Sequence, residues 1–331
     1  MQAVQVHVPG GPEQLMLVDL PQPQPGPGQV RIKAKAIGVG RPDVLIRNGT
    51  YKWMPPLPAI PGAELAGVID AVGAGVDQWQ LGDRVLVSAR ELEQRGGCYV
   101  QAMVVNQEAP YRLPLAVSFE DAVSLPNLQL ALALMRVAGQ PQGDLPSVLI
   151  TGASGGVAGM LCQVAKSRGF TTLGTSRTEA KSRDALAQGF DHVIGPGPTS
   201  MNERVLAITQ GKGVDLVFDH LGGQSLVDGL HSLAPLGTLV SYNIVQGMPT
   251  QDVFGLLRKW LGKSLAVRCF SMHTLDQDPL ARRALMLSAI DLMAQGIVKA
   301  PVHQIFQLSD VRRTHELLDL GLASGKIVMH P

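Results

Sequence analysis

The chain has 331 residues, of which 45% are hydrophobic and 17% charged, and its formal net charge at pH 7 is +1. This length exceeds one ordinary domain, and the composition is that of a folded chain with a large apolar core. The balanced charge gives no basic surface that would indicate nucleic acid or a membrane as a partner. Cys98, Cys162 and Cys269 lie far apart, which argues against a disulfide framework. With no apolar run long enough to span a bilayer and no signal-peptide pattern, we expect a cytoplasmic protein.

The first third of the chain is rich in glycine and proline and is predicted to fold as an irregular β domain. Turn signals such as Pro-Gly-Pro-Gly at residues 25–28 separate short apolar runs that are typical of strands. The expected strands are residues 30–34, 67–72, 84–88 and 99–105. At Ser118 the pattern changes, because Ser-Phe-Glu-Asp before an apolar run is typical of a helix capping box. We therefore expect one helix from Ser118 to about residue 137.

From residue 147 onward, short apolar strands alternate with helical segments. The expected strands are residues 148–151, 172–175, 192–194, 216–219, 238–242 and 265–270. Strands that alternate with helices of this length form parallel βαβ units, with right-handed crossovers and helices on both faces of the sheet. After residue 279 come two helical patterns, the second at residues 308–318, and a strand at residues 325–329. We expect this tail to return to the first domain.

The segment from Ser147 to Gly159 reads as a buried strand, a glycine-rich turn and the start of a helix. Glycines at positions 152, 155 and 156 let the backbone approach a diphosphate, and the helix N-terminus offers N–H groups and a positive dipole. A lone glycine pattern is weak, but here it stands in the required strand–turn–helix context. The motif predicts a dinucleotide site, and the alternative is a purely structural turn. The expected contacts are Ser154, Gly155, Gly156 and Val157.

The end of the second expected strand bears on the choice between NADH and NADPH. An NAD site usually has an acidic side chain here, which accepts from the ribose 2′-hydroxyl. This chain has Ser176 and Arg177, Lys181 follows one helical turn later, and no carboxylate precedes Glu179. Hydroxyl and cationic donors suit a 2′-phosphate, so Ser176, Arg177 and Lys181 predict NADPH as the cofactor. The alternative is that Arg177 and Lys181 are ordinary solvated charges at a helix start.

Further landmarks are spread along the whole chain. They are Gly38-Val39 with Asp43, Arg47-Asn48-Gly49-Thr50-Tyr51, Pro61-Gly62-Ala63-Glu64, Leu81-Gly82-Asp83-Arg84-Val85, Leu221-Gly222-Gly223 and Gly325-Lys326-Ile327-Val328. With these residues the chain resembles the zinc-independent medium-chain dehydrogenases/reductases, which include quinone oxidoreductases of the zeta-crystallin type and mitochondrial-type enoyl-thioester reductases.

The resemblance implies an α/β fold of two domains. Residues 1–118 and 272–331 would form a GroES-like, β-rich catalytic domain, and residues 119–271 an NADP-binding Rossmann domain with a doubly wound parallel sheet. It also implies cofactor contacts at four further positions. These are Leu221, Asn243, Phe270 and Lys326.

Two positions argue against a catalytic metal. Zinc-dependent relatives carry a Cys at the position of Gly40 and a His at the position of Ala63, and neither substitute can ligate Zn²⁺. Three cysteines in total cannot build the four-cysteine structural site, so we expect no metal. Without a Lewis acid, alcohol oxidation has no group to polarise the substrate oxygen. Reduction of a quinone or an electron-poor C=C bond needs less help, which favours a reductase.

Tyr51 is the candidate catalytic acid. It lies in a segment that resembles the one with which enoyl-thioester reductases deliver or orient a proton, and a phenol is protonated at neutral pH. The alternative is that Tyr51 is only a wall of the substrate pocket. The chain also departs from quinone reductases, because Gly40 and Ala131 replace polar residues and His220 replaces a serine.

The sequence therefore predicts NADPH-dependent hydride transfer to a quinone or an α,β-unsaturated carbonyl. One alternative is a reductase of CoA- or carrier-linked enoyl thioesters, and an alternative of another class is a non-catalytic NADPH-binding protein. The partner is then a small-molecule substrate. We also expect a homodimer that pairs the exposed edge strand at residues 265–270, which has no proline and one charge.

Overall fold

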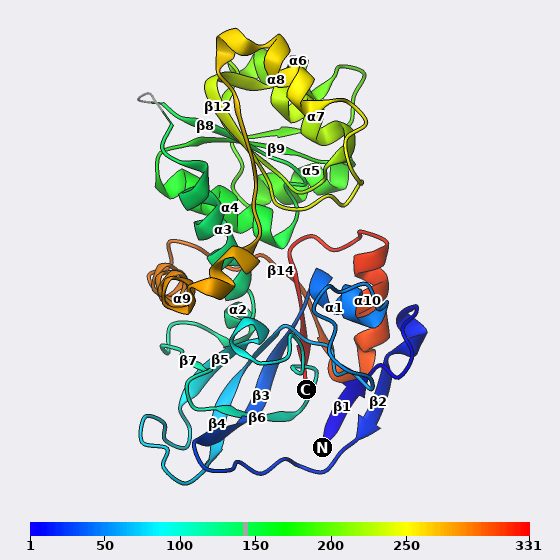
Figure 1. Cartoon of the computed structure of the whole chain (residues 1–331), viewed down its shortest axis with the longest axis vertical. Coiled ribbons are helices and arrows are strands. Elements are labelled where there is room, and N and C mark those ends of the chain that lie inside the picture. The colour runs from blue at the N-terminus through cyan, green and yellow to red at the C-terminus, as the bar shows by residue number, and fades with distance from the viewer. Residues whose placement is uncertain (142–144) are drawn as a thin grey trace. The chain divides into compact units, whose positions relative to one another are not determined.

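The computed structural model describes residues 1–141 and 145–331, which form two compact units (Figure 1). The first unit comprises Met1–Pro126 and Leu287–Pro331, and the second comprises Asn127–Met286. The tail thus returns to the first unit, as the sequence predicts. The domain boundaries expected after residues 118 and 271 stay a prediction. In the part of the chain that the structure describes, no helix has the length and apolar character needed to cross a membrane.

The first unit is built on a seven-stranded sheet in the order β14-β15-β3-β4-β5-β7, with β6 also paired to β3. Its strands are β3 (Gln29–Val39), β4 (Glu64–Val72), β5 (Arg84–Ser88), β6 (Ala102–Asn106), β7 (Tyr111–Arg112), β14 (Val302–Gln307) and β15 (Lys326–His330). All pairs are antiparallel except β14 with β15. The sequence prediction missed β14, because half of its side chains are polar, most are exposed, and its apolar residues do not alternate with polar ones.

Shorter elements complete the first unit. They are the antiparallel pair β1 (Gln2–Gln5) and β2 (Met16–Asp19), the helices α1 (Arg41–Arg47), α2 (Phe119–Ala122) and α10 (Val311–Asp319), and the 3₁₀ turns η1 (Pro12–Gln14), η2 (Ala89–Glu91) and η5 (Leu308–Asp310). The core under the sheet is formed by fully buried side chains such as Ile32, Leu65 and Tyr99.

The single helix expected from Ser118 to about residue 137 is wrong. The structure has two helices here, α2 and α3 (Leu125–Ala138), separated by Val123 and Ser124. Pro126 explains the break, because a proline has no N–H and is tolerated in the first turn of a helix but not in its interior. The capping at the start is confirmed, since the Ser118 side chain accepts from the Asp121 N–H at 3.0 Å.

The second unit contains a six-stranded, all-parallel sheet in the order β10-β9-β8-β11-β12-β13. In chain order this is 3-2-1-4-5-6, the doubly wound arrangement of dinucleotide-binding folds. The strands are β8 (Ser147–Ile150), β9 (Thr171–Thr175), β10 (His192–Ile194), β11 (Val214–Asp219), β12 (Leu233–Ser241) and β13 (Ala266–Cys269).

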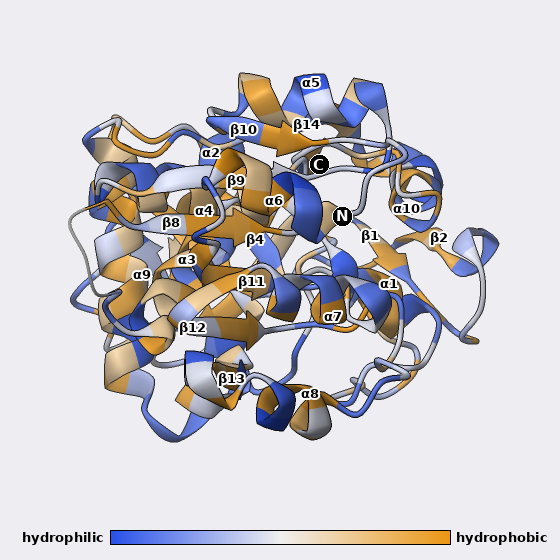
Figure 2. Ribbon diagram, turned by 90° about the horizontal axis from the view of Figure 1, so that it is seen from above, coloured by the Kyte–Doolittle hydropathy of each residue, from blue (hydrophilic) through white to orange (hydrophobic). Residues whose placement is uncertain are grey.

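Helices cover both faces of this parallel sheet, α4 and α5 on one side and α6, α7 and α8 on the other (Figure 1). They are α4 (Gly156–Ser167), α5 (Glu179–Ala187), α6 (Met201–Ile208), α7 (Gly223–His231) and α8 (Val253–Lys259), followed along the chain by the turns η3 (Leu261–Lys263) and η4 (Met272–Gln277) and by α9 (Pro279–Ala294). The central strands β8 and β11 are buried throughout, and most of their residues are apolar (Figure 2). Burial on both faces explains the apolar runs 148–150 and 216–218.

Candidate functional site

The glycine-rich turn joins β8 to α4 and leaves the N-terminus of α4 open. Gly155 is the N-cap of this helix and makes no side-chain capping bond. A Cβ placed on Gly155 would have a single neighbour within 4 Å, the Gly152 carbonyl oxygen at 3.3 Å. Ser154 is buried, whereas Gly155, Gly156 and Val157 are half-buried. The first N–H groups of a 12-residue helix therefore face an uncrowded space, the arrangement that binds a phosphate.

Glycine in the neighbouring strand lets the turn pack closely. A Cβ on Gly174 would lie 2.5 Å from the Ala153 Cβ and 2.9 Å from the Phe190 ring, so β9 could not carry a larger residue there. The Gly152 N–H donates to the Thr175 hydroxyl at 3.1 Å. These contacts fix the turn against the end of β9.

A hydroxyl and two cations follow β9. The Ser176 hydroxyl is 2.6 Å from that of Ser182, and the Lys181 N–H donates to the Thr178 side chain at the start of α5. Arg177 is exposed. Burial, and then the positive charge of Arg177, lower the pKa of Lys181. Two cations this close repel each other, and an anion bound between them would relieve the repulsion.

Other expected cofactor contacts lie at the same edge of the sheet. Leu221, Asn243 and Phe270 follow the carboxyl ends of β11, β12 and β13, just as the glycine turn and Ser176 follow β8 and β9. Ligands of open parallel sheets bind outside this edge, where the strand order reverses. The structure thus places the expected cofactor contacts of the second unit after the carboxyl ends of parallel strands of one sheet, and their contact with a cofactor stays a prediction.

Lys326, the remaining expected cofactor contact, lies in the first unit within a buried ion pair. Its Nζ is 3.1 Å from Glu64 Oε2, and the two side chains are only 4% and 8% exposed. A Cβ on Gly38 would lie 2.8 Å from both Glu64 Oε2 and Lys326 Cε, so this position has no room for a side chain. The ammonium group is thus held by Glu64, and its contact with a cofactor stays a prediction. Sequence reasoning missed this pair.

A second buried carboxylate lies nearby. Asp43 accepts hydrogen bonds from the Gly40 N–H at 2.8 Å and the Gly62 N–H at 3.1 Å. Burial, reinforced by the charge of Glu64, raises the pKa of Asp43 from 3.8 to about 7, although Lys326 acts in the opposite direction. Two buried carboxylates therefore lie near one lysine, and burial favours the protonated form of Asp43.

The positions of the zinc ligands in metal-dependent relatives adjoin this pair. A Cβ on Gly40 would lie 3.7 Å from Lys326 Nζ and 3.9 Å from Asp43 Oδ2. Among residues 1–141 and 145–331, no group of three or more His, Cys, Asp or Glu side chains is placed to hold a metal ion. The cation beside Gly40 is the lysine of this chain itself.

Tyr51 lies a few residues after α1, in the first unit. It is half-buried, and its ring is 5.7 Å from that of Trp53, with an angle of 60° between the planes. Trp53 is 37% exposed, and the Lys52 ammonium lies 5.2 Å from its ring centre. Aromatic side chains of this kind suit a planar substrate, but the role of Tyr51 itself stays a prediction.

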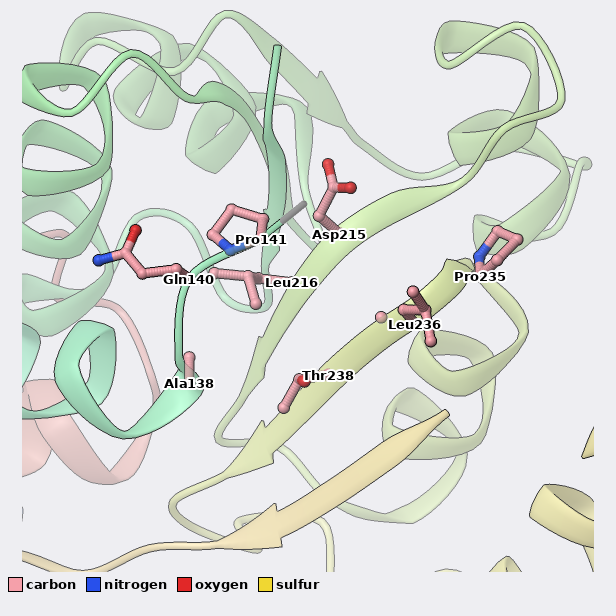
Figure 3. A pocket seen from close by; sticks show the side chains of 9 residues that line it. Ala138, Gln140, Pro141, Asp215, Leu216, Pro235, Leu236 and Thr238 are labelled. Carbon is pink, nitrogen blue, oxygen red and sulfur yellow. The ribbon is translucent and has the colours of Figure 1, made fainter. Parts of the chain in front are cut away.

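Two other features of the second unit, a small pocket and a histidine, are held by hydrogen bonds within the fold. A small pocket lined by residues such as Pro141, Asp215 and Leu236 lies towards the amino end of β11, at the edge opposite the glycine turn (Figure 3). The Asp215 carboxylate accepts there from the Ser147 N–H at 2.7 Å.

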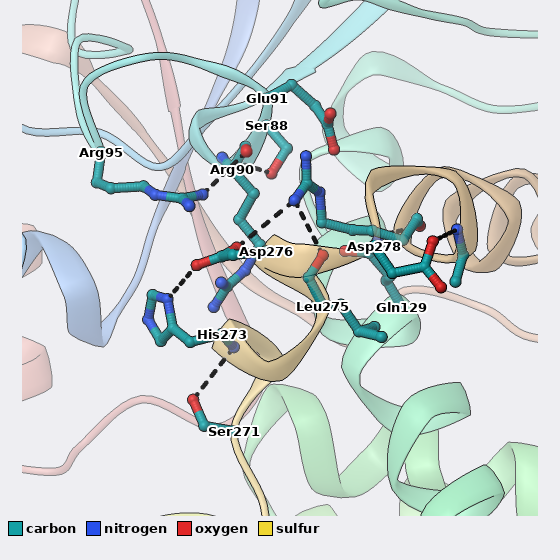
Figure 4. A network of polar contacts seen from close by, with 12 residues as sticks. Ser88, Arg90, Glu91, Arg95, Gln129, Ser271, His273, Leu275, Asp276 and Asp278 are labelled. Atoms are coloured by element: carbon teal, nitrogen blue, oxygen red, sulfur yellow. Dashed lines mark hydrogen bonds and ion pairs between the residues drawn. The ribbon is translucent and has the colours of Figure 1, made fainter.

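His273 Nδ1 lies 2.9 Å from Asp276 Oδ2 in η4 (Figure 4). This histidine is therefore held in place rather than a loose loop residue.

Comparison with known proteins agrees with this geometry. Residues 26–114 match the family model "Alcohol dehydrogenase GroES-like domain", and residues 156–284 match "Zinc-binding dehydrogenase". The quinone oxidoreductase of Salmonella typhimurium is 33% identical, with 99% of each chain covered, and quinone oxidoreductase 1 of Escherichia coli is 30% identical with the same coverage. The structure of an Escherichia coli quinone oxidoreductase complexed with NADPH has a TM-score of 0.85 and 31% identity over 100% of both chains.

The two units are thus the GroES-like and Rossmann domains of a medium-chain dehydrogenase/reductase. Within that class, the chain belongs to the quinone oxidoreductase family. The expected fold class and family resemblance are confirmed. One family model has zinc in its name, but Gly40 and Ala63 of this chain have no side-chain atoms that could bind zinc.

The raised pKa of Asp43 makes stability depend on pH. Between its ordinary pKa of 3.8 and about 7, the folded chain retains a proton that the unfolded chain loses, so the free energy of unfolding falls as pH rises through this interval. Asp43→Asn removes the titration and keeps the shape. We expect the free energy of unfolding in urea to fall more steeply for the wild type than for this variant between about pH 4 and pH 7.

The matched control is Asp70→Asn, which removes a partly exposed carboxylate bonded to Arg31 in the same unit. This variant should keep the steep fall of the wild type. A difference between wild type and Asp43→Asn that is constant over the whole pH interval would contradict the prediction.

Proposed function

We propose that the chain reduces a quinone or an α,β-unsaturated carbonyl with hydride from NADPH. The observation that carries the proposal is the pair Arg177 and Lys181 after β9, the strand next to the one that leads to the uncapped start of α4, in a chain that resembles quinone oxidoreductases over its full length. A structural neighbour is described as complexed with NADPH. NADPH, when bound, supplies the hydride.

The residues present fit this cofactor. The N–H groups of Gly155, Gly156 and Val157 would bind the diphosphate, where the helix dipole favours negative charge. Ser176, Arg177 and Lys181 would hold the 2′-phosphate. Leu221, Asn243 and Phe270 would orient the nicotinamide half, because they follow β11, β12 and β13 on the other side of the strand-order reversal.

A quinone or an enone suits the groups that the first unit offers. Gly40 and Ala63 supply no metal ligands, so the substrate must accept hydride without a Lewis acid at these positions. A conjugated carbonyl delocalises the arriving charge onto its oxygen. Tyr51 would then donate a proton to that oxygen or to the adjacent carbon. Reduction of enoyl thioesters uses the same chemistry, but the relatives of Salmonella typhimurium and Escherichia coli are quinone oxidoreductases by name, which favours quinones.

We also propose that the protein acts in the cytoplasm as a homodimer. The three cysteines are free, which is typical of proteins that fold in a reducing compartment. The strand β13 lies at an edge of the six-stranded sheet, and it has no proline and a single charged residue, Arg268. Ala266, Arg268 and Cys269 are exposed. Such an edge invites pairing with another strand.

The cationic pair should determine cofactor preference. We expect the wild type to bind NADPH more tightly than NADH in fluorescence titrations. Arg177→Ala/Lys181→Ala should lose NADPH affinity by about 1–3 kcal/mol per charge-assisted contact and should leave NADH affinity nearly unchanged. Arg183→Ala removes a charge from another face of the same helix and serves as the control. Equal dissociation constants of the wild type for the two cofactors would refute the assignment.

The substrate class and the role of Tyr51 can be tested together. We expect steady-state NADPH oxidation with quinones and enones, and Tyr51→Phe should lower kcat on the best enone by on the order of 10²-fold. On quinones it should have little effect, because both quinone oxygens can take protons from water. Full retention of kcat on the enone would reduce Tyr51 to a pocket wall. If the protein reduced enoyl-CoA but neither quinones nor enones, enoyl thioesters would replace the proposed substrate class.

Sedimentation velocity tests the dimer. We expect a dimer that persists on dilution, and Cys269→Lys should shift it towards the monomer because it adds a charge to the exposed edge strand. Leu186→Lys changes another exposed side chain of the second unit and should leave the dimer intact. A wild-type protein that is monomeric at every concentration would exclude this interface.

A further inference from the structure

His220 lies at the point where the strand order of the parallel sheet reverses. It directly follows Asp219, the last residue of β11, and β11 pairs with β8, from which the glycine turn emerges. A Cβ on Gly152 would lie 2.2 Å from His220 Cε1 and 2.9 Å from Nε2, so the ring rests on the glycine of the turn. Gly152 has a φ of +62° and is the residue that makes this close approach possible.

Hydrogen bonds connect this histidine to the end of β8. The Thr151 hydroxyl donates to Asp219 Oδ1 at 3.0 Å and accepts from the His220 backbone N–H at 3.2 Å. His220 Nδ1 is 3.5 Å from the same hydroxyl oxygen, at the outer limit of a hydrogen bond. The other ring nitrogen, Nε2, lies against Gly152.

The surroundings of the ring decide its charge. Burial lowers the pKa of His220, and the Asp219 carboxylate and a hydrogen bond with the Thr151 backbone partly offset this effect. That carboxylate also accepts from the Gly222 N–H at 2.8 Å and the Ser225 hydroxyl at 3.0 Å, which spreads its charge. The Tyr242 ring, from the end of β12, is 5.8 Å away, and burial raises the pKa of its phenol, so it stays neutral. In the free protein near pH 7 the imidazole is therefore mostly neutral.

A dinucleotide changes this balance, because its diphosphate places negative charge over the glycine turn. We propose that His220 binds the diphosphate in its protonated form, so that binding of NADP⁺ takes up a proton on the imidazole ring. This inference rests on the proposed function. The proton comes from solvent, and both nitrogens of the imidazolium are then donors, of which Nδ1 lies near the Thr151 hydroxyl and Nε2 against the glycine turn. His220 is thus a residue that makes cofactor affinity depend on pH.

The sign of the dependence follows from linkage. A ligand that binds the protonated ring more tightly gains affinity as pH falls from the pKa of the bound state, and the gain levels off below the pKa of the free state. The 2′-phosphate of the ligand also titrates near pH 6. Its contribution is the same for every variant with an intact phosphate site, so it cancels in a comparison between wild type and His220→Gln.

Calorimetric titration with NADP⁺ at about pH 6, in two buffers of different ionisation enthalpy, measures the proton uptake directly. We expect the wild type to take up about half a proton more than His220→Gln, and its affinity to rise about three- to tenfold more between pH 8 and pH 6. His220→Ser should behave like His220→Gln and provides a second variant if one folds poorly. His192→Gln, which changes an exposed histidine at the start of β10, should behave like the wild type.

The outcomes separate the two proposals. Equal proton uptake by wild type and His220 variants that all bind NADP⁺ would overturn the role of His220 and leave the proposed function standing. No measurable binding of NADP⁺ or NADPH to the wild type would overturn the proposed function itself, and the inference with it.

Discussion

The parallel pairing of β8 with β11 is the constraint on which the candidate cofactor site depends. Leu216, Val217 and Phe218 lie beside the three strand residues before Thr151, so both strands end at the same level. The chain leaves β8 towards one face of the sheet and β11 towards the other, and this divergence opens a crevice at the edge of the sheet. The open start of α4 and the side chains after β11 consequently face the same space.

The first unit buries two carboxylates, those of Asp43 and Glu64, and stabilises them with its own donor groups. Asp43 receives two backbone N–H groups, and Glu64 receives the Lys326 ammonium. Each buried carboxylate thus has hydrogen-bond partners, although burial still raises the pKa of Asp43. Since Lys326 begins β15 and Glu64 begins β4, with β3 between them in the sheet, the ion pair links strands that are distant in sequence.

The second unit could largely be predicted from the sequence, because each parallel strand is a short apolar run between helices and the glycine motif fixes where the first turn falls. Elements without such a signal were missed. The strand β14 is mostly exposed and its apolar residues do not alternate with polar ones, and α1 has only seven residues. The break at Pro126 was overlooked, although a proline inside a helical pattern is a known boundary signal.

The residues of the candidate site likewise fall into those that the sequence predicts and those that it does not. Contacts that follow strand ends were predictable, because parallel strands bring their carboxyl ends to one edge. The Lys326–Glu64 pair was not, since nothing local links residues 262 positions apart. The position of the His220 ring over Gly152 also depends on the register of β8 and β11, which the sequence pattern does not fix, since the hydrogen bond between Thr151 and Asp219 joins residues 68 positions apart.

The Lys326–Glu64 pair also bears on how such a chain could change over evolutionary time. A cysteine introduced at Gly40 would place its thiol beside an ammonium group that Glu64 already holds. The new thiolate would gain a lysine counter-ion, and a divalent cation would meet electrostatic repulsion from the same lysine. Metal binding at position 40 would therefore also require Lys326 to change. A chain that lost the lysine first would carry Glu64 buried without its partner, which is destabilising.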